Sequence, residues 1–403
     1  MTFAAGLSQH PVPAHAIGEV VGQVLEQLGG DEDAIPVDLA VLFVSPHHIG
    51  AIEDVASAVR NLLRPRVLLG CSAAAVIGGN REVEEESGIS LLVGSLPGSR
   101  LVPMQLRVQP THSGPALIGW DDTVHGGTLL TLIDPFSVPG DGLLHWLNAN
   151  RPDVQVIGGL ASAARGPGGN RLIFNDTIAT EGAVCVLLED VVVDTVVSQG
   201  CRPIGQPWVV TRATSNVVEE LAGRPALARL SETVEGLSED DRMLLQHGLH
   251  VGIVVDEHRT EFERGDFIVR NVLGIDHERG AVAIGDVPEI GQTVQFHARD
   301  AASADEDLRE LIGMRANDGH VEAALLFTCN GRGRHLFGAP DHDASVIETL
   351  LGPLPLAGMF CAGELGPVGG RNFLHGFTAS IALLRTGARE GARTMPGDPG
   401  SAA

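Results

Sequence analysis

One order of elements occurs three times along this chain: a strand, a helix, a second strand, a glycine-rich loop and a third strand. The copies occupy segments 38–96, 128–189 and 321–385, and their loops contain Gly-Gly-Asn-Arg twice and Gly-Gly-Arg-Asn once. Self-similarity of this kind indicates related structural units that pack on one another. We therefore predict an α/β fold of two joined domains, built from repeated strand–helix–strand–Gly-loop–strand units with mixed sheets. We expect the three units to superpose and their glycine loops to converge on one pocket.

The character of the sequence changes at three places and divides the chain into four parts. Residues 1–35 contain an amphipathic stretch that ends at a glycine pair, which predicts an N-terminal helix. Residues 36–225 hold the first two copies, and residues 226–385 hold turn-rich strand patterns followed by the third copy. A helical pattern of apolar residues begins at Asn216, close to this boundary. Residues 386–403 are rich in Gly, Pro and Arg and are predicted to be a disordered tail.

The charge of the chain limits its partners. The 403 residues include 27 Lys plus Arg against 51 Asp plus Glu, a formal net charge of −24. Such a surface repels phosphate backbones and anionic lipid headgroups, so we expect neither a nucleic-acid nor a membrane partner. The chain has no Lys, which removes the phosphate-binding loop that needs one and all Schiff-base chemistry. A small molecule is the partner that remains, and no cofactor is expected.

The cysteines and the N-terminal region predict a cytoplasmic protein. The five cysteines are widely spaced without a Cys-x-x-Cys pair, which is typical of reduced, buried thiols. The first Arg is Arg60, whereas signal and transit peptides begin with positive charge. The apolar runs are too short to span a bilayer. Adjacent histidines such as His47-His48 lack a third ligand at metal-site spacing, so no metal site is expected.

Six short sequence blocks, in this order along the chain, resemble those of one family. They are GCSAAA at 70–75, QGCRPIGQP at 199–207, RNVLGID at 270–276, QTVQFHARDA at 292–301, TCNGRG at 328–333 and CAGELGP at 361–367. The chain therefore resembles the FIST family, with an N-terminal and a C-terminal FIST domain. This resemblance implies a sensory protein of intracellular signal transduction that binds a small ligand, with amino acids the suggested ligands. No sequence after Arg385 is similar to the output domains often fused to this family, so we expect a stand-alone sensor with an unidentified signalling partner.

The candidate ligand-binding residues lie in the C-terminal part. With no Lys in an acidic chain, a ligand carboxylate needs an Arg or a backbone amide nest. Arg332 follows a buried-looking strand between two glycines, and we predict that it anchors a small carboxylate or zwitterion with help from Asn330. Glu364, in the next glycine loop, could hold the ligand's ammonium group or pair with a nearby arginine. Arg270 interrupts a strand and Asn372 ends the third glycine loop, so both are further candidates. Arg299 interrupts a strand in the same way as Arg270, and for both a structural ion pair is the alternative to a ligand contact.

The loop at Cys71 and Ser72 allows two interpretations. Its small residues suit a ligand that rests on backbone amides, which makes Cys71 and Ser72 candidate ligand contacts. Gly70-Cys71-Ser72-Ala73-Ala74 also resembles a nucleophile elbow, but Ala74 stands where that motif has a glycine. The alternative function is therefore a hydrolase or transferase with Cys71 or Ser72 as nucleophile, although no convincing catalytic constellation accompanies it. The acidic run at Glu82 and 84–86 is predicted to be a solvated surface loop.

Overall fold

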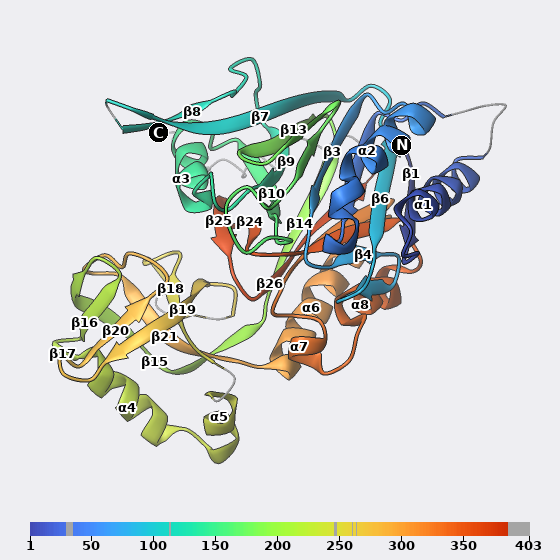
Figure 1. The fold of residues 1–403 in the computed structure, drawn as a ribbon. Coiled ribbons are helices and arrows are strands. Elements are labelled where there is room, and N and C mark those ends of the chain that lie inside the picture. Colours follow the sequence, from blue (N-terminus) through green and yellow to red (C-terminus); the bar gives the residue numbers. More distant parts are fainter. Residues whose placement is uncertain (30–34, 113, 246–247, 260, 263, 386–403) are drawn as a thin grey trace, which may run out of the picture.

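The computed structural model, which describes residues 1–29, 35–112, 114–245, 248–259, 261–262 and 264–385, contains an α/β body and a smaller β-barrel (Figure 1). Three mixed sheets form the body, and residues 201–299 form the barrel. The mixed α/β class predicted from the sequence is confirmed. Within the described ranges, the model contains no helix with the length and apolar character of a membrane span.

Each of the three sheets of the body combines strands from two of the repeated segments. The first sheet has the order β1 (Thr2–Ser8), β6 (Ile89–Ser95), β2 (Leu39–Val44), β3 (Val67–Ser72), β11 (Leu172–Phe174) and β12 (Thr177–Ala179). The second has the order β8 (Gly114–Ile118), β7 (Arg100–Thr111), β13 (Ala183–Glu189), β9 (Gly127–Ile133), β10 (Val154–Leu160), β24 (Glu364–Val368) and β25 (Arg371–His375). The third has the order β14 (Val192–Gln199), β26 (Thr378–Arg385), β22 (Ala323–Cys329), β23 (Leu356–Cys361), β4 (Val76–Gly78) and β5 (Arg81–Val83).

The strand orders show that the three segments exchange their hairpins in a cycle. In every sheet the first two strands of one segment are parallel, and its last strand pairs antiparallel with the first. The hairpin at the edge comes from another segment: β11–β12 joins the first sheet, β24–β25 the second and β4–β5 the third. The first glycine loop joins β4 to β5 and the third joins β24 to β25, whereas the second precedes β11. The first and third loops line different surface hollows, so the predicted convergence of the loops on one pocket is wrong. Superposition of the units stays a prediction.

A glycine occupies the same place in the second strand of each segment. Gly70, Gly158 and Gly358 lie beside the first strand, and a Cβ at any of them would clash with the carbonyl oxygen of a first-strand residue. Those residues are the register partners Leu42, Thr131 and Leu326. Glycine is therefore required in each segment for the two parallel strands to approach this closely.

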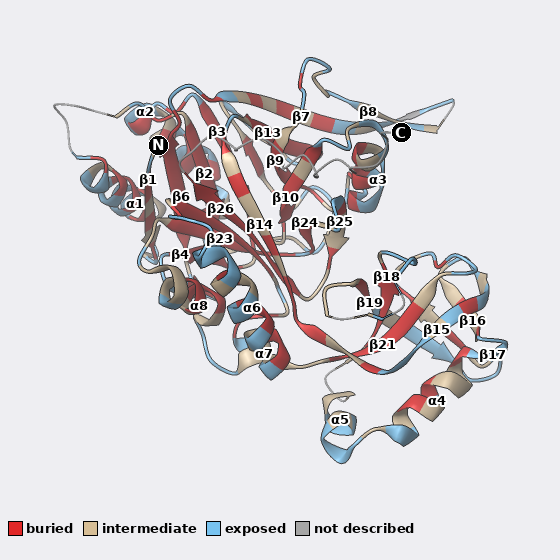
Figure 2. Cartoon of the chain, turned by 180° about the vertical axis from the view of Figure 1, so that it is seen from behind, coloured by how far each residue is buried: buried red, intermediate tan, exposed pale blue. Residues whose placement is uncertain are grey.

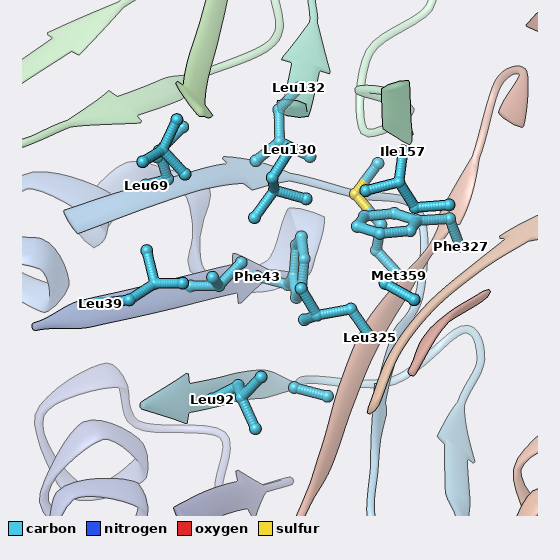
Figure 3. Packing of buried hydrophobic residues seen from close by; sticks show 14 of the residues in the cluster. Leu39, Phe43, Leu69, Leu92, Leu130, Leu132, Ile157, Leu325, Phe327 and Met359 are labelled. Atoms are coloured by element: carbon cyan, nitrogen blue, oxygen red, sulfur yellow. The ribbon is translucent and has the colours of Figure 1, made fainter. Parts of the chain in front are cut away.

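The inner faces of the three sheets share one hydrophobic core (Figure 3). Phe43 of the first segment and Phe327 of the third meet edge to face with ring centroids 6.0 Å apart. Leu130 and Ile157 of the second segment complete the contact among the three segments. Each fully buried side chain of this size contributes about 1.5–3 kcal/mol, so this core holds the segments together.

Helices cover the outer faces of the sheets, with buried strands inside and exposed helix faces outside (Figure 2). The first sheet carries α1 (Pro13–Gln27) and α2 (Ile52–Leu63), whose apolar faces pack on it. The second carries α3 (Gly140–Asn150), and the third carries α6 (Ala301–Ala316) and α8 (His342–Leu351). The predicted N-terminal helix is present as α1, whereas β1 before it was not predicted. The predicted tail lies outside the described residues.

The barrel closes because the strand at one end of its sheet order also pairs with the sixth strand in that order. Its order is β15 (Cys201–Thr214), β21 (Thr293–Arg299), β18 (Leu249–Val254), β19 (Phe267–Asp276), β20 (Ala281–Ile284), β16 (Val217–Leu221) and β17 (Arg224–Pro225), and β15 also pairs with β16. The helices α4 (Ala226–Gly236) and α5 (Glu239–Leu244) belong to the same part, and α4 packs on the barrel core. The helix predicted from Asn216 is wrong over 217–221, because Val217 and Val218 pair with β20 instead. The predicted boundary at residue 225 falls inside the barrel.

Candidate functional site

The chain passes between body and barrel at two neighbouring points. It leaves the body at Gly200, after β14, and returns at Asp300, before α6. The Asp300 N–H donates to the Gly200 carbonyl oxygen at 3.3 Å, so the two crossings lie side by side. A Cβ at Gly200 would clash with the Phe377 carbonyl oxygen and would lie 3.3 Å from Arg332 Nη1. The crossing therefore packs directly against Arg332 and the turn before β26.

Arg332 is fully buried in a bidentate ion pair. Its Nε and Nη2 lie 2.7 and 2.8 Å from the two carboxylate oxygens of Asp343, at the start of α8. The Thr328 hydroxyl donates to the same carboxylate at 2.7 Å. Although burial opposes ionisation of Asp343, the Arg332 guanidinium holds the pKa of this carboxyl well below its usual range. The pair is therefore charged, and the fork of Arg332 that was predicted to hold a ligand holds Asp343.

Several buried polar atoms around Arg332 have no hydrogen-bond partner. They are Nη1 of Arg332, Oε1 of Glu364, Nε of Arg299, both ring nitrogens of His250 and Nε2 of His297. We call Arg299, Arg332, Glu364, His250 and Phe377 the junction cluster. Buried polar groups in folded proteins nearly always have a partner, because an unsatisfied one costs about 1–3 kcal/mol. The junction cluster therefore has unused capacity to bind a polar group.

Glu364 is an uncharged acid near neutral pH. It begins β24, and its Oε2 accepts hydrogen bonds from the Thr378 N–H at 3.2 Å and the Thr378 hydroxyl at 2.8 Å. Burial raises the pKa of Glu364 to about 8, against the opposing effects of Thr378 and of the Arg332 charge. Because Oε2 accepts both of these hydrogen bonds, the proton of the uncharged acid lies on Oε1, which has no hydrogen-bond partner. The Cys329 thiol lies beside the same carboxyl group. An ammonium group is the donor that would favour ionisation of this carboxyl.

The barrel contributes a second guanidinium, which stacks on an aromatic ring of the body. Arg299, at the end of β21, donates from Nη2 to the Gly331 carbonyl oxygen and stacks over Phe377, with its Cζ 5.5 Å from the ring centroid. Among the residues that the structure describes, no carboxylate lies within 4.0 Å of this guanidinium. The His250 ring lies 4.2 Å from the Phe377 ring, and burial lowers the pKa of His250 to about 4. Arg299 is therefore the uncompensated charge of the cluster.

Two other predicted residues have their polar groups occupied by structural contacts. Arg270 of the barrel pairs with Asp286 at 2.7 Å, and it reaches the body through the Leu374 carbonyl oxygen at 2.6 Å and Asp141 at 3.2 Å. Asn372 bonds the backbone of β10 through both ends of its amide, at 2.8 and 2.9 Å. Arg270 therefore ties barrel to body, and Asn372 fixes the exchanged β24–β25 hairpin next to β10.

Asn330 directly precedes Gly331, whose carbonyl oxygen Arg299 contacts. Its side chain is exposed, and its N–H donates to the Cys361 carbonyl oxygen at 2.9 Å. Of the seven residues proposed from the sequence, Arg332 and Glu364 come together in the cluster, and Asn330 is two residues from Arg332. Arg299 was marked in the sequence as a polar interruption of a strand, like Arg270, and no local pattern marked Phe377.

Cys71 and Ser72 are the last two residues of β3, in the first sheet. The Cys71 thiol is buried in the central core with its sulfur 3.2 Å from the Met359 sulfur, and burial raises its pKa far above the ordinary value. The Ser72 hydroxyl accepts a hydrogen bond from the Arg171 N–H at 2.9 Å. These partners include no histidine that could act as a base, so the contacts give the nucleophile interpretation no support.

The prediction of a solvated acidic run is wrong at Glu82, whereas Glu85 and Glu86 are exposed as predicted. Glu82 is only 3% exposed and accepts a hydrogen bond from the Ala344 N–H at 3.0 Å, at the first turn of α8. Burial, and then the Asp343 charge, raise the pKa of Glu82 to about 8. The Glu84 carboxylate accepts from the Arg334 N–H at 3.0 Å. Both contacts exist because the exchanged hairpin carries this run into the third sheet.

A surface hollow between the first and third segments is a weaker candidate. It has a volume of about 480 Å³ and is lined in part by Gln23, Gln27, Gly78 and Glu348. Gln23 and Gln27 each make paired hydrogen bonds to the backbone of β1 and so have their amides engaged. Within the described ranges, no group of three or more His, Cys, Asp or Glu side chains could hold a metal ion. The junction cluster is therefore the better candidate.

Comparison with known proteins gives consistent matches over nearly the whole chain. The model of the FIST N domain matches residues 38–224, and that of the FIST C domain matches residues 226–367. The "Uncharacterized protein Mb0898c" of Mycobacterium bovis is 45% identical over 388 residues, which are 95% of this chain and 99% of that protein. The "Uncharacterized protein Rv0628c" of Mycobacterium tuberculosis is 44% identical over 388 residues, 95% of this chain and 100% of that protein.

Proposed function

The chain belongs to the FIST family, whose domains are sensory domains of signal transduction, and on this premise we propose that it senses an amino acid or another small carboxylate in the junction cluster. One observation carries the proposal. One buried nitrogen each on Arg332 and Arg299 and one buried carboxyl oxygen on Glu364 lack a hydrogen-bond partner, and the three side chains are neighbours. Groups of opposite hydrogen-bonding character, held by rigid strand ends, are what a small polar ligand requires.

The position of the cluster suits a sensor. Residues of the barrel and of the body both line it, so a ligand there would change contacts between the two parts. A sensor needs a downstream reader, and we propose an unidentified protein partner in the cytoplasm. The formal charge of −24 supports a small ligand over nucleic acid.

A thermal-shift screen of the purified chain against the standard amino acids and small mono- and dicarboxylates tests this function. A ligand at about a hundred times its dissociation constant adds about 2.7 kcal/mol of stability, so its melting temperature should rise with ligand concentration. Glu364→Gln, which removes the ionisable acceptor, should reduce the shift. If no compound stabilises the wild-type chain at millimolar concentration, the proposed function is wrong.

The second candidate, a hydrolase or transferase, places Cys71 or Ser72 at the reacting atom. We propose instead that the protein has no catalytic role, and the burial of Cys71 beside Met359 supports this. Cys71→Ala and Ser72→Ala variants should keep the ligand response of the wild type. Loss of a measured hydrolytic activity in either variant, with folding intact, would favour the enzyme.

A further inference from the structure

The charges of the junction cluster do not cancel. Arg332 and Asp343 neutralise each other, and the pKa of about 8 keeps Glu364 protonated near pH 7. The imidazole of His250 is neutral, because its pKa is about 4. Arg299 then remains as a positive charge without an acidic partner among the described residues. One negative charge would therefore neutralise the cluster, and Arg299 is the group that would receive it.

Each of the two arginines has one buried nitrogen without a hydrogen-bond partner. The fork of Arg332 binds Asp343, which leaves only Nη1 of that guanidinium unpartnered. Arg299 has an unpartnered Nε, while its Nη2 bonds Gly331. A single carboxylate between the two arginines would satisfy donors on both. The main anchor is then a residue of the barrel, Arg299, for which a structural ion pair was the alternative interpretation of the sequence.

Oε1 of Glu364 is buried and unpartnered, and Glu364 belongs to the body. An ammonium group at this oxygen would favour ionisation of Glu364, which would release its proton to solvent and leave a carboxylate–ammonium ion pair. A molecule with a carboxylate and an ammonium on neighbouring carbons would thus satisfy barrel and body together. The ring of Phe377, between Arg299 and His250, would form an apolar side of the site.

We propose that an α-amino acid bridges the barrel and the body, with its carboxylate on Arg299 and Nη1 of Arg332 and its ammonium on Glu364. This inference rests on the proposed function and adds which part of the protein, barrel or body, holds each end of the ligand. It also gives a mechanism for sensing. Since the two chain crossings at Gly200 and Asp300 are adjacent, a ligand that contacts both the barrel and the body would fix one against the other.

The test uses the full chain and, for an amino acid that stabilises it, two analogues. One analogue is the amine without the carboxylate, and the other is the α-hydroxy acid without the ammonium. Dissociation constants are measured by calorimetry for the wild type, Arg299→Gln, Arg299→Lys and Glu364→Gln. Arg279→Gln is the matched control, because Arg279 is a barrel arginine with a side chain 81% exposed.

Removal of a charged hydrogen bond of this kind lowers the affinity for the ligand by about 10- to 150-fold. Arg299→Gln should weaken amino-acid binding by that factor and leave binding of the amine unchanged, and Arg299→Lys should recover part of the loss. Glu364→Gln should weaken amino-acid binding and leave the hydroxy acid unchanged. Amino-acid binding should also slow amide hydrogen exchange at 199–202 and 299–302, and Arg299→Gln should remove this protection.

Each contrary result has a separate meaning. If Arg299→Gln, with an unchanged melting temperature, binds the amino acid as Arg279→Gln does, the bridging inference is wrong while the sensor function stands. If the hydroxy acid binds the wild type as tightly as the amino acid does, Glu364 does not receive an ammonium and the inference is wrong. If no amino acid or carboxylate binds the wild-type chain, the free atoms hold only water and the proposed function fails as well.

Discussion

Replacement of Asp343 by Ala should destabilise the protein strongly. The change leaves Arg332, which is fully buried, as a charge without its partner, and it removes the acceptor of the Thr328 hydroxyl. Loss of one member of a buried ion pair costs about 3–5 kcal/mol, because the remaining charge stays out of water. We expect a loss in this range for the free energy of unfolding.

The double variant Arg332→Met, Asp343→Leu separates burial of charge from loss of packing. Replacement of both charges by apolar groups of similar volume is often neutral or stabilising, so the double variant should regain most of the loss. Urea denaturation followed by circular dichroism measures the midpoint, and an unchanged m-value shows that stability alone has changed. Asp318→Ala is the control, since its pair with Arg315 is exposed and should contribute less than about 1 kcal/mol.

If Asp343→Ala costs no more than Asp318→Ala, the argument from the buried pair is refuted, and the fork of Arg332 is free for a ligand after all. The same argument governs binding experiments. An Arg332→Ala variant would leave Asp343 unpaired, so loss of affinity in that variant would report folding as well as ligand contact. For this reason the ligand tests use Arg299 and Glu364.

Three further predictions follow from burial and backbone geometry. Glu82 and Glu364 each have a folded-state pKa of about 8, which lies above the unfolded value. Their contribution to the free energy of unfolding is therefore complete below about pH 4 and is lost as pH rises through about 8, by about 1.4 kcal/mol per pH unit for each group. Urea denaturation at pH 5, 6.5 and 8 should show this slope, and either Glu→Gln variant should reduce it. Gly200→Ala should destabilise the chain through its clash with the Phe377 carbonyl, whereas Gly22→Ala, in open space on α1, should raise stability by about 0.5–1 kcal/mol; equal effects in thermal denaturation would contradict the structure. Iodoacetamide should label Cys71 only after denaturation, as judged by mass spectrometry, and labelling of the native chain would show that the thiol is accessible.

Local patterns predicted the elements whose partners are near in sequence. The apolar run at 39–44 and the amphipathic stretch at 52–63 each bury a regular face, so their periodicity carried enough information. The pattern from Asn216 failed because two adjacent valines suit a helix face and a strand equally, and pairing with β20 decided the outcome. Single-sequence periodicity does not contain that partner.

The exchange of hairpins could not be predicted from the order of elements. Either edge of a two-stranded hairpin can pair with a sheet, and the sequence of β4–β5 does not indicate which of the three sheets it joins. The error at Glu82 follows directly, since this carboxylate is buried by α8, which lies more than 250 residues away. Composition predicted an exposed acidic loop, and a non-local contact placed one of its residues at a helix N-terminus.

The candidate site was predicted only in part, because local patterns identify residues within one segment but not contacts between distant parts of the chain. Arg332 and Glu364 follow strands of one segment, so the topology of that segment brings their loops together. Arg299 reaches them only because the barrel returns to the body at the point where it left, with Asp300 bonded to Gly200. A joint with two adjacent crossings restrains the barrel weakly by itself, so side-chain contacts across the joint must set its orientation. Arg270 supplies such contacts permanently, through Leu374 and Asp141. Arg299 has unused donors at the same joint, and a ligand that engages them would add the contact that a sensor can gain or lose.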